Sequence, residues 1–249
     1  MPASDAAASL DPADIARFEA IGDDWWDPMG SMRALHEINP LRIAWLRDTI
    51  VRRFRTSPGG GEAPLAGLTI LDIGCGAGLL AEPLARLGAD VTGLDPAPGN
   101  IEVARRHAAE TGASLAYRAA TLEQLASEEP SFHVVLAMEV VEHVRDMPRF
   151  VRTACGLVRP GGLFAASTLN RTLKSFALAI VGAEYVLGWL PRGTHRWEQF
   201  VTPEELSGAF RSAGLREIAR AGVVYNPLAA AWRVSRDTGV NYLIAAKRP

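Results

Sequence analysis

Residues 71–78 read Leu-Asp-Ile-Gly-Cys-Gly-Ala-Gly, and an acidic residue, Asp95, follows seventeen positions later. Apart from Asp72, residues 68–73 are aliphatic or β-branched, as expected of a buried parallel strand. The three glycines that follow form a turn without Cβ atoms, so the backbone can approach a ligand closely. Asp95 ends the next apolar run, where a carboxylate can accept hydrogen bonds from ribose hydroxyls. The pattern predicts a strand–turn–helix unit that binds a nucleoside.

The spacing of the glycines narrows the class of ligand. A dinucleotide fingerprint would need glycine or alanine at position 79, where the chain has Leu79, and no Gly-Lys-Ser/Thr follows the turn to cradle phosphates. Asp72 followed by Gly74, Gly76 and Gly78 resembles motif I of the class I S-adenosylmethionine-dependent methyltransferases, whose cofactor carries no phosphate. The alternative, a tight turn with no ligand, leaves the position of Asp95 unexplained.

Composition is typical of one folded domain. The chain has 249 residues, of which 48% are hydrophobic and 22% are charged, enough to bury a substantial core. A net charge of −2 gives no electrostatic reason to expect nucleic acid as a partner. Residues 1–10 lack the apolar and basic features of a signal peptide or presequence, so we expect a bacterial cytoplasmic protein. Two cysteines, Cys75 and Cys155, suit a reducing compartment as free thiols.

The rest of the chain alternates between helical and strand patterns. Helices are expected at residues 12–22, 40–54, 79–87, 99–111, 122–126 and 147–157 and from residue 202, and strands at 114–118, 132–138, 163–168, 215–224 and 241–246. Such alternation predicts a parallel sheet with helices on both faces. The motif I resemblance implies an α/β, Rossmann-like class I methyltransferase fold, with seven strands of which the last is antiparallel. We expect an N-terminal helical cap at residues 1–56 and a methyltransferase domain at residues 65–249.

An acidic turn follows the fourth expected strand. Ligands bind at the carboxyl ends of the strands in such sheets, so Met138 and the residues after it should lie opposite the glycine turn. If these residues form one helical turn, Glu139, Glu142 and His143 share a face through their i, i+3 and i+4 spacing. Two carboxylates and an imidazole can hold a divalent cation. The alternative is a structural role without a metal, in which Glu139 favours a helix N-terminus and His143 forms a hydrogen bond with nearby backbone.

A closer resemblance covers residues 12–247. The chain is similar to the family of ubiquinone biosynthesis O-methyltransferases in the segments Trp25-Trp26-Asp27, His36-Glu37-Ile38-Asn39-Pro40-Leu41-Arg42, Leu71–Gly78, Met138–His143, Ser167-Thr168-Leu169-Asn170-Arg171, Val181-Gly182-Ala183-Glu184-Tyr185, Gly193-Thr194-His195, Asn226-Pro227 and Val240-Asn241-Tyr242. The resemblance implies methylation of a catechol-type hydroxyl on a polyprenylated ring, both in an early dihydroxy-aromatic intermediate and in demethylubiquinol.

The resemblance also implies roles for particular residues. Those expected to contact S-adenosylmethionine are Arg42, Asp72, Gly74, Gly76, Gly78, Asp95 and Met138, and those expected to bind Mg²⁺ are Glu139, Glu142 and His143. Arg42 suits the methionine carboxylate because a planar guanidinium can pair with it through two bonds. A metal that chelates both catechol oxygens would lower the pKa of the phenol, and alternatively His143 acts as a general base. The sequence does not separate these two mechanisms, which leave Glu142 and His143 as the expected catalytic residues.

An apolar insert at residues 171–198 suggests where the substrate is met. Residues 176–183 are apolar or small, but the run is interrupted by Glu184, so it is too short and too charged to cross a membrane. Basic residues flank the run, and Tyr185, Trp189 and Trp197 are typical of a membrane interface. We therefore expect peripheral contact with the cytoplasmic membrane, where a polyprenylated catechol or quinol resides. The alternative is a lid or a subunit contact.

Two other functions stay open at this point. The chain could methylate another small phenol or an amine, in which case the insert is only a lid. It could also be a regulator that binds S-adenosylmethionine without catalysis, which would need Gly74–Gly78 and Asp95 but no acidic turn at 139–143. The expected partners are the polyprenylated substrate, the membrane surface and other ubiquinone biosynthesis enzymes, and not nucleic acid.

Overall fold

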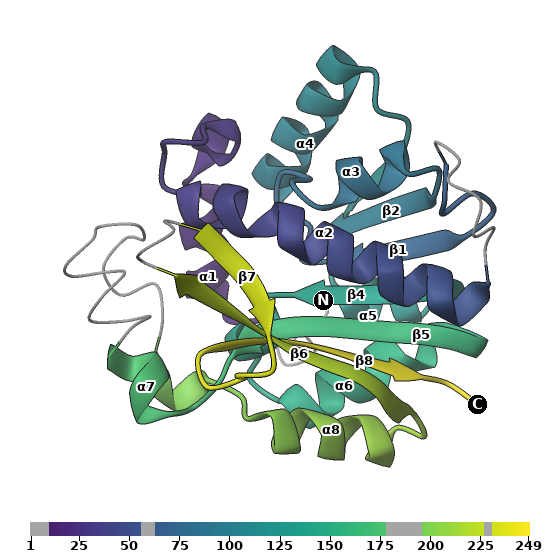
Figure 1. The fold of residues 1–249 in the computed structure, drawn as a ribbon. Helices are drawn as coiled ribbons and strands as arrows, with labels where there is room; N and C mark the ends of the chain where they lie inside the picture. Colours follow the sequence, from purple (N-terminus) through teal and green to yellow (C-terminus); the bar gives the residue numbers. More distant parts are fainter. Residues whose placement is uncertain (1–9, 56–62, 178–195, 227–230) are drawn as a thin grey trace, which may run out of the picture.

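The computed structural model describes residues 10–55, 63–177, 196–226 and 231–249 of the chain. Within these residues the strands form one sheet of eight, in the order β3-β2-β1-β4-β5-β8-β6-β7. Figure 1 shows the sheet as a central layer with helices on both sides, and the α/β fold with helices on both faces is as predicted.

The parallel half of the sheet is built around β1 (Thr69–Ile73). It pairs with β2 (Asp90–Asp95) on one side and with β4 (Phe132–Met138) on the other, both in parallel. β3 (Ala116–Ala119) extends the sheet beyond β2, and β5 (Val158–Leu169) extends it beyond β4, again in parallel. The carboxyl ends of β1, β2 and β4 therefore meet at one edge, as the sequence predicted.

The antiparallel half holds one strand more than predicted. β8 (Asn241–Lys247) runs antiparallel to both β5 and β6 (Arg216–Asn226), as expected for the last strand of this fold. β7 (Ala231–Ser235) then adds to β6 as an antiparallel edge strand, which makes eight strands in the described residues where the sequence predicted seven. β7 lacks a buried residue, so no hydrophobic pattern marks it, and its ladder to β6 defines it instead.

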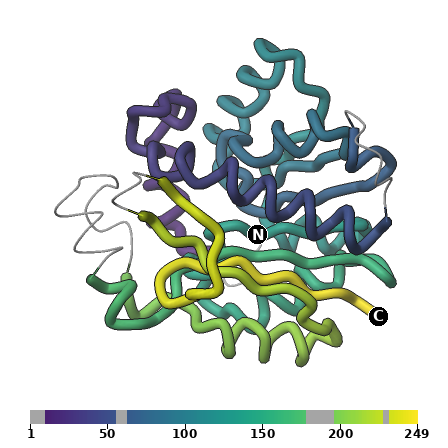
Figure 2. The backbone as a smooth tube through the Cα atoms, viewed as in Figure 1, coloured from purple at the N-terminus to yellow at the C-terminus, as the bar shows by residue number. Residues whose placement is uncertain are grey.

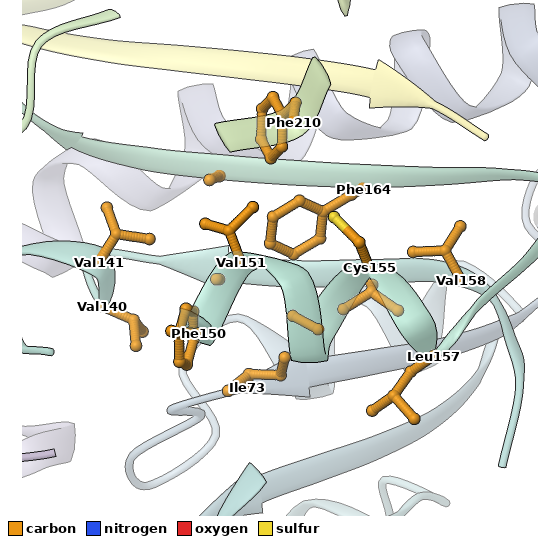
Figure 3. Close-up of a cluster of buried hydrophobic side chains, with 14 of the residues drawn as sticks. Ile73, Val140, Val141, Phe150, Val151, Cys155, Leu157, Val158, Phe164 and Phe210 are labelled. Carbon is orange, nitrogen blue, oxygen red and sulfur yellow. The ribbon is translucent and has the colours of Figure 1, made fainter. Parts of the chain in front are cut away.

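One face of the sheet is covered by α5 (Leu122–Ala126), α6 (Met147–Gly156) and α8 (Pro203–Ser212). Their apolar side chains pack with the sheet in one cluster, and Figure 3 labels members of it from α6, α8 and the strands. Phe164 of β5 and Phe210 of α8 meet edge to face there, with ring centroids 5.2 Å apart and both side chains fully buried.

The other face is covered by α2 (Arg33–Phe54), α3 (Ala81–Arg86) and α4 (Pro98–Thr111). The sequence predicted that α2 begins at Pro40, because proline lacks the N–H that an interior helical position requires. The structure corrects this, since α2 begins at Arg33 and contains Pro40. Packing of Ile38 against β6 and β8 overrides the local cost of the proline.

Two short helices precede α2 and lie beside α4, as Figure 2 shows in purple. α1 (Pro12–Glu19) begins where the Asp11 side chain accepts a hydrogen bond from the backbone N–H of Ala13. In η2 (Gly22–Trp26), the Trp26 ring stacks on His107 of α4 at a centroid distance of 3.4 Å. These two helices and α2 all lie within residues 1–56, the predicted N-terminal cap, and the division of the chain into this cap and a domain at residues 65–249 stays a prediction.

Most of the predicted membrane-contacting insert lies outside the described residues. Of residues 171–198, the structure describes 171–177, with α7 (Leu173–Ser175), and 196–198, with the start of η5 (Trp197–Gln199). No helix in the described ranges is both long enough and apolar enough to span a membrane.

Candidate active site

The glycine turn lies between the ends of β1 and β2. The backbone N–H groups of Gly74 and Cys75 both donate to the Leu94 carbonyl, at 2.7 and 3.1 Å, which fixes the turn to the neighbouring strand. Gly76 has a φ of +53° and faces Trp25, whose ring an added Cβ would approach to 2.6 Å. A Cβ on Gly78 would overlap the Tyr117 hydroxyl, so Gly78 serves the packing of this turn.

Asp95 at the end of β2 binds the glycine turn through its side chain. Its two carboxylate oxygens accept hydrogen bonds from the backbone N–H groups of Gly76, at 3.0 Å, and Ala97, at 2.9 Å. The Asn100 side-chain amide donates a third, at 3.2 Å, and Trp25 Nε1 donates to the Asn100 oxygen at 3.1 Å. The Asp95 carboxylate therefore joins the glycine turn, the end of β2 and the N-terminal segment that carries Trp25. Burial raises the pKa of this carboxylate.

Asp72, inside β1, is a second buried carboxylate in the same place. It is 2% exposed, and its Oδ2 atom is buried without a hydrogen-bond partner. Burial, reinforced by the negative charge of Asp95, raises the pKa of Asp72 to about 7. A buried carboxylate oxygen with no partner at a cavity wall is suited to accept a hydrogen bond from a cationic ligand group.

A cavity of about 920 Å³ brings most of the predicted site residues together. Its lining includes eight of the ten, from β1, β2, α2, the glycine turn and the end of β4, namely Arg42, Asp72, Gly74, Gly76, Asp95, Met138, Glu139 and His143. Gly78 and Glu142 do not line it. The predicted meeting of the glycine turn with the residues after the fourth strand is therefore confirmed.

The acidic turn has a different conformation from the one predicted. Glu139 has a φ of +58° and precedes the 3₁₀ turn η3 (Val141–His143), so residues 139–143 do not form one helical turn. Arg42 holds Glu139 in place: its Nη2 lies 2.6 Å from Glu139 Oε1, and Arg42 is 3% exposed. Ser167 and Asn241 also donate to Glu139, at 2.7 and 3.2 Å. This network stabilises the left-handed backbone of Glu139.

Glu142 and His143 lie on different sides of the turn. Glu142 is 2% exposed, and both of its carboxylate oxygens are buried without a hydrogen-bond partner. Burial and the charge of Glu139 raise the pKa of Glu142 well above its usual range, which favours the protonated form of the side chain. His143 faces the cavity instead, and its Nδ1 lies 3.2 Å from Asp14 Oδ2.

The three expected magnesium ligands do not fit a metal ion in this arrangement. Arg42 already neutralises Glu139, and Glu142 does not line the cavity. Within the described ranges, no group of three histidine, cysteine, aspartate or glutamate side chains is placed to hold a metal ion. Magnesium binding therefore stays a prediction, and no chemical step below depends on it.

Two residues of the site were missed by sequence reasoning. Asn100 orients the Asp95 carboxylate, and Asp14 contacts His143 from 129 positions away. Asn100 lies five residues after Asp95, within the first turn of α4, and this nearness was the available signal. Asp14 reads in sequence as an ordinary acidic residue of a first helical turn, so nothing marked it.

Comparison with known proteins agrees with this geometry. The family described as "Methyltransferase domain" matches residues 42–219. A ubiquinone biosynthesis O-methyltransferase of Methylobacterium nodulans is 64% identical, over 97% of this chain and 96% of the relative. One of Brucella anthropi is 52% identical, over 98% of each chain.

Solved structures share the fold. The magnesium protoporphyrin IX methyltransferase of Synechocystis with bound SAH (S-adenosylhomocysteine) superposes with a TM-score of 0.62 at 19% identity, covering 88% of this chain and 86% of that one. The N-methyltransferase NodS of Bradyrhizobium japonicum, also in complex with SAH, gives a TM-score of 0.57 at 18% identity, with coverage of 95% and 97%.

The fold and the glycine-turn site together define a class I methyltransferase, an enzyme that takes its methyl group from S-adenosylmethionine. Identity of 52–64% over nearly the full length narrows the assignment. The chain belongs to the family of ubiquinone biosynthesis O-methyltransferases. The resemblance found in the sequence is therefore confirmed.

The raised pKa of Asp72 makes stability depend on pH. The folded protein retains this proton up to a pH of about 7, whereas the ordinary value is 3.8. Unfolding therefore releases a proton between these values, and the stability that Asp72 contributes falls as the pH rises from about 4 to about 7. We expect Asp72→Asn to flatten this decline in denaturant titrations at pH 5 to 8. The exposed Asp90→Asn should keep the wild-type slope, and an unchanged slope in Asp72→Asn would contradict the prediction.

Proposed function

We propose that the enzyme methylates a catechol-type hydroxyl of polyprenylated aromatic intermediates, including demethylubiquinol and the earlier dihydroxy compound. The observation that supports this most is the composition of the cavity. One part of its lining is the glycine turn with Asp95, another is the turn that carries His143, and a third is apolar. The first part suits a charged nucleoside cofactor, the second suits an acidic hydroxyl, and the third suits a hydrophobic ring.

The cofactor residues divide by the part of S-adenosylmethionine that each one suits. Asp95 is placed at a strand end to accept hydrogen bonds from ribose hydroxyls, and Asn100 keeps the carboxylate oriented. The unpartnered oxygen of Asp72 suits the methionine ammonium group. Arg42 keeps one buried N–H, Nε, without a partner, and this group suits the methionine carboxylate even while Nη2 pairs with Glu139.

We assign to His143 the removal of the proton from the substrate hydroxyl. When bound, S-adenosylmethionine would supply a methyl group on its sulfonium sulfur: the substrate oxygen would bond to the methyl carbon as the carbon–sulfur bond breaks, and S-adenosylhomocysteine would leave with the electron pair. A phenol with a pKa near 10 is mostly protonated at neutral pH, so a base must take its proton. His143 is the imidazole that lines the cavity. Holding the hydroxyl in line with the methyl group can contribute about 7–11 kcal/mol to lowering a barrier of this kind.

The apolar lining offers a place for the substrate ring and the start of its tail. It is formed by side chains from α2, β5, β6, β7 and the β7–β8 loop, namely Ile38, Leu169, Val223, Tyr225, Trp232 and Val240. Trp232 of β7 is fixed to α2 because its Nε1 donates to Glu37 Oε2 at 3.1 Å. The Tyr225 and Trp232 rings lie 5.2 Å apart, so the added strand supplies an aromatic wall.

Peripheral contact with the inner face of the cytoplasmic membrane would bring the enzyme to this substrate. Leu173 is 81% exposed and Phe176 is 45% exposed, at the start of the apolar insert 171–198. Exposed large apolar side chains next to basic residues are typical of a surface that lies in a lipid interface. This membrane contact is a proposal that rests on these residues and on the nature of the substrate.

Methyl transfer itself tests the proposed function. Labelled S-adenosylmethionine and a short-tailed demethylubiquinol should give a labelled product, and no transfer to any catechol would contradict the proposal. We expect His143→Ala to reduce turnover severely, while the affinity for S-adenosylmethionine stays close to wild type. The measurement is repeated with and without a chelator.

Glu142→Gln separates the two mechanisms. If Glu142 acts as the protonated acid that its burial favours, the neutral glutamine replaces it with little loss of turnover, and a chelator has little effect. If Glu142 binds magnesium as a carboxylate, the variant is inactive, and a chelator suppresses the wild type until magnesium is restored.

Asp95→Asn tests the cofactor site. The amide replaces one acceptor oxygen with a donor, and loss of a charged hydrogen bond costs about 1.5–3 kcal/mol, or roughly 10- to 150-fold in affinity. Calorimetric titration with S-adenosylmethionine measures this change. Asp90→Asn, an exposed position at the start of the same strand, is the matched control and should bind normally. Unchanged affinity in Asp95→Asn would remove Asp95 from the site.

Vesicle co-sedimentation tests the membrane contact. The double variant Leu173→Ser with Phe176→Ser should bind less to vesicles that contain anionic lipid, because each substitution removes apolar area from the interface. It should still methylate a tail-less catechol. Met29→Ser, at a position that is 71% exposed on the N-terminal segment, serves as the control. Equal binding of the double variant and the wild type would contradict membrane contact through this segment.

A further inference from the structure

His143 and Asp14 form a buried polar pair between the active-site turn and the N-terminal helix. His143 Nδ1 lies 3.2 Å from Asp14 Oδ2, and the two residues are 8% and 5% exposed. A buried carboxylate is costly unless it is paired, so the contact holds the two segments in one arrangement. The pair belongs to α1 and η3, which are far apart in the sequence.

Neighbouring contacts fix both members of this pair. The other carboxylate oxygen of Asp14 lies 3.0 Å from Arg17 Nη2, one turn along α1. Phe18 meets the His143 ring edge to face, with centroids 5.2 Å apart and an interplanar angle of 82°. Leu10 and Val144 form an antiparallel β-bridge directly beside the pair. These contacts restrict the rotation of both the carboxylate and the imidazole, and a positioning role requires such restriction.

We propose that Asp14 is a positioning residue that holds His143 with its proton on Nδ1. The proposal rests on the proposed function, in which His143 serves the substrate hydroxyl. A carboxylate only accepts hydrogen bonds, so the imidazole nitrogen that faces it carries the hydrogen. A neutral imidazole then has its lone pair on Nε2. Base catalysis needs a lone pair on a fixed nitrogen, and Asp14 determines which nitrogen provides it.

This role makes the N-terminal helix part of the active site. Asp14 lies outside residues 42–219, which match the methyltransferase domain family, so the positioning group comes from a segment beyond the shared domain. Helix α1 also places Ile15 and Phe18 in the cavity lining. The same helix therefore closes the cavity and sets the orientation of the residue that acts in it.

Nitrogen NMR of the imidazoles tests the positioning directly. The chain has five histidines, so selective ¹⁵N-histidine labelling gives a simple spectrum, and His143→Gln identifies the His143 signals. In chelator-treated enzyme without cofactor, we expect His143 to be the Nδ1–H tautomer. Asp14→Ala should shift it towards the Nε2–H form. Asp14→Asn keeps the size of the side chain and therefore controls for a folding defect in Asp14→Ala. It should also reduce the Nδ1–H population.

Kinetics provide the second readout. We expect Asp14→Ala to lower kcat about 10-fold or more, because a general base contributes about 10²–10⁴-fold only when the imidazole is correctly held. The KM for the catechol and the affinity for S-adenosylmethionine should stay close to wild type. Asp11→Ala is the matched control, because it removes the N-cap of α1 but leaves Asp14 in place. Its kcat should stay near that of the wild type.

The outcomes separate this proposal from the proposed function. Failure of the wild type to methylate any catechol contradicts the function, while the NMR result still decides the role of Asp14. An Nε2–H tautomer in the wild type overturns the positioning role. The positioning role is also overturned if both Asp14 variants keep the His143 tautomer and the kcat of the wild type. A loss of kcat in Asp11→Ala equal to that in Asp14→Ala would mean that α1 acts only as a cover, and would also overturn it.

Discussion

The pairing of β1 with β2 and β4 is the constraint on which the site depends. Because both neighbours run parallel to β1, three carboxyl ends meet at one edge of the sheet. The glycine turn follows β1, Asp95 ends β2, and Met138 ends β4. Asp95 then accepts a hydrogen bond from the Gly76 N–H, so the strand pairing also fixes the turn that approaches the cofactor. A shift in register would separate these groups and remove the site.

Buried charges around the cavity stabilise each other and prepare the site at the same time. Arg42 neutralises Glu139 and supports its left-handed backbone, which directs the chain into the turn that carries His143. Asp72 and Glu142 have no such partner, and their raised pKa values follow from burial next to another carboxylate. The site therefore contains paired charges that hold geometry and unpaired acids that respond to a ligand or to pH.

The sequence correctly predicted the elements that are determined by residues close together along the chain. Strand β4 and helix α5 lie at the predicted residues, because an apolar run and a capping threonine mark them locally. The start of α2 was wrongly predicted at Pro40, since the packing that overrides the proline comes from β6 and β8, whose Val223 and Leu243 follow Ile38 by 185 and 205 residues. β7 was missed because an exposed edge strand carries no hydrophobic pattern.

The sequence by itself determined the fold class, the glycine turn with its acidic partner, and the family. Each depends on residues whose spacing along the chain is set by one strand, one turn or one helix. Only the tertiary structure decided that Arg42 pairs with Glu139, that Glu142 does not line the cavity, and that Asp14 meets His143. The physical reason is that pairing and burial of charges depend on distances through space, which the folded chain alone creates.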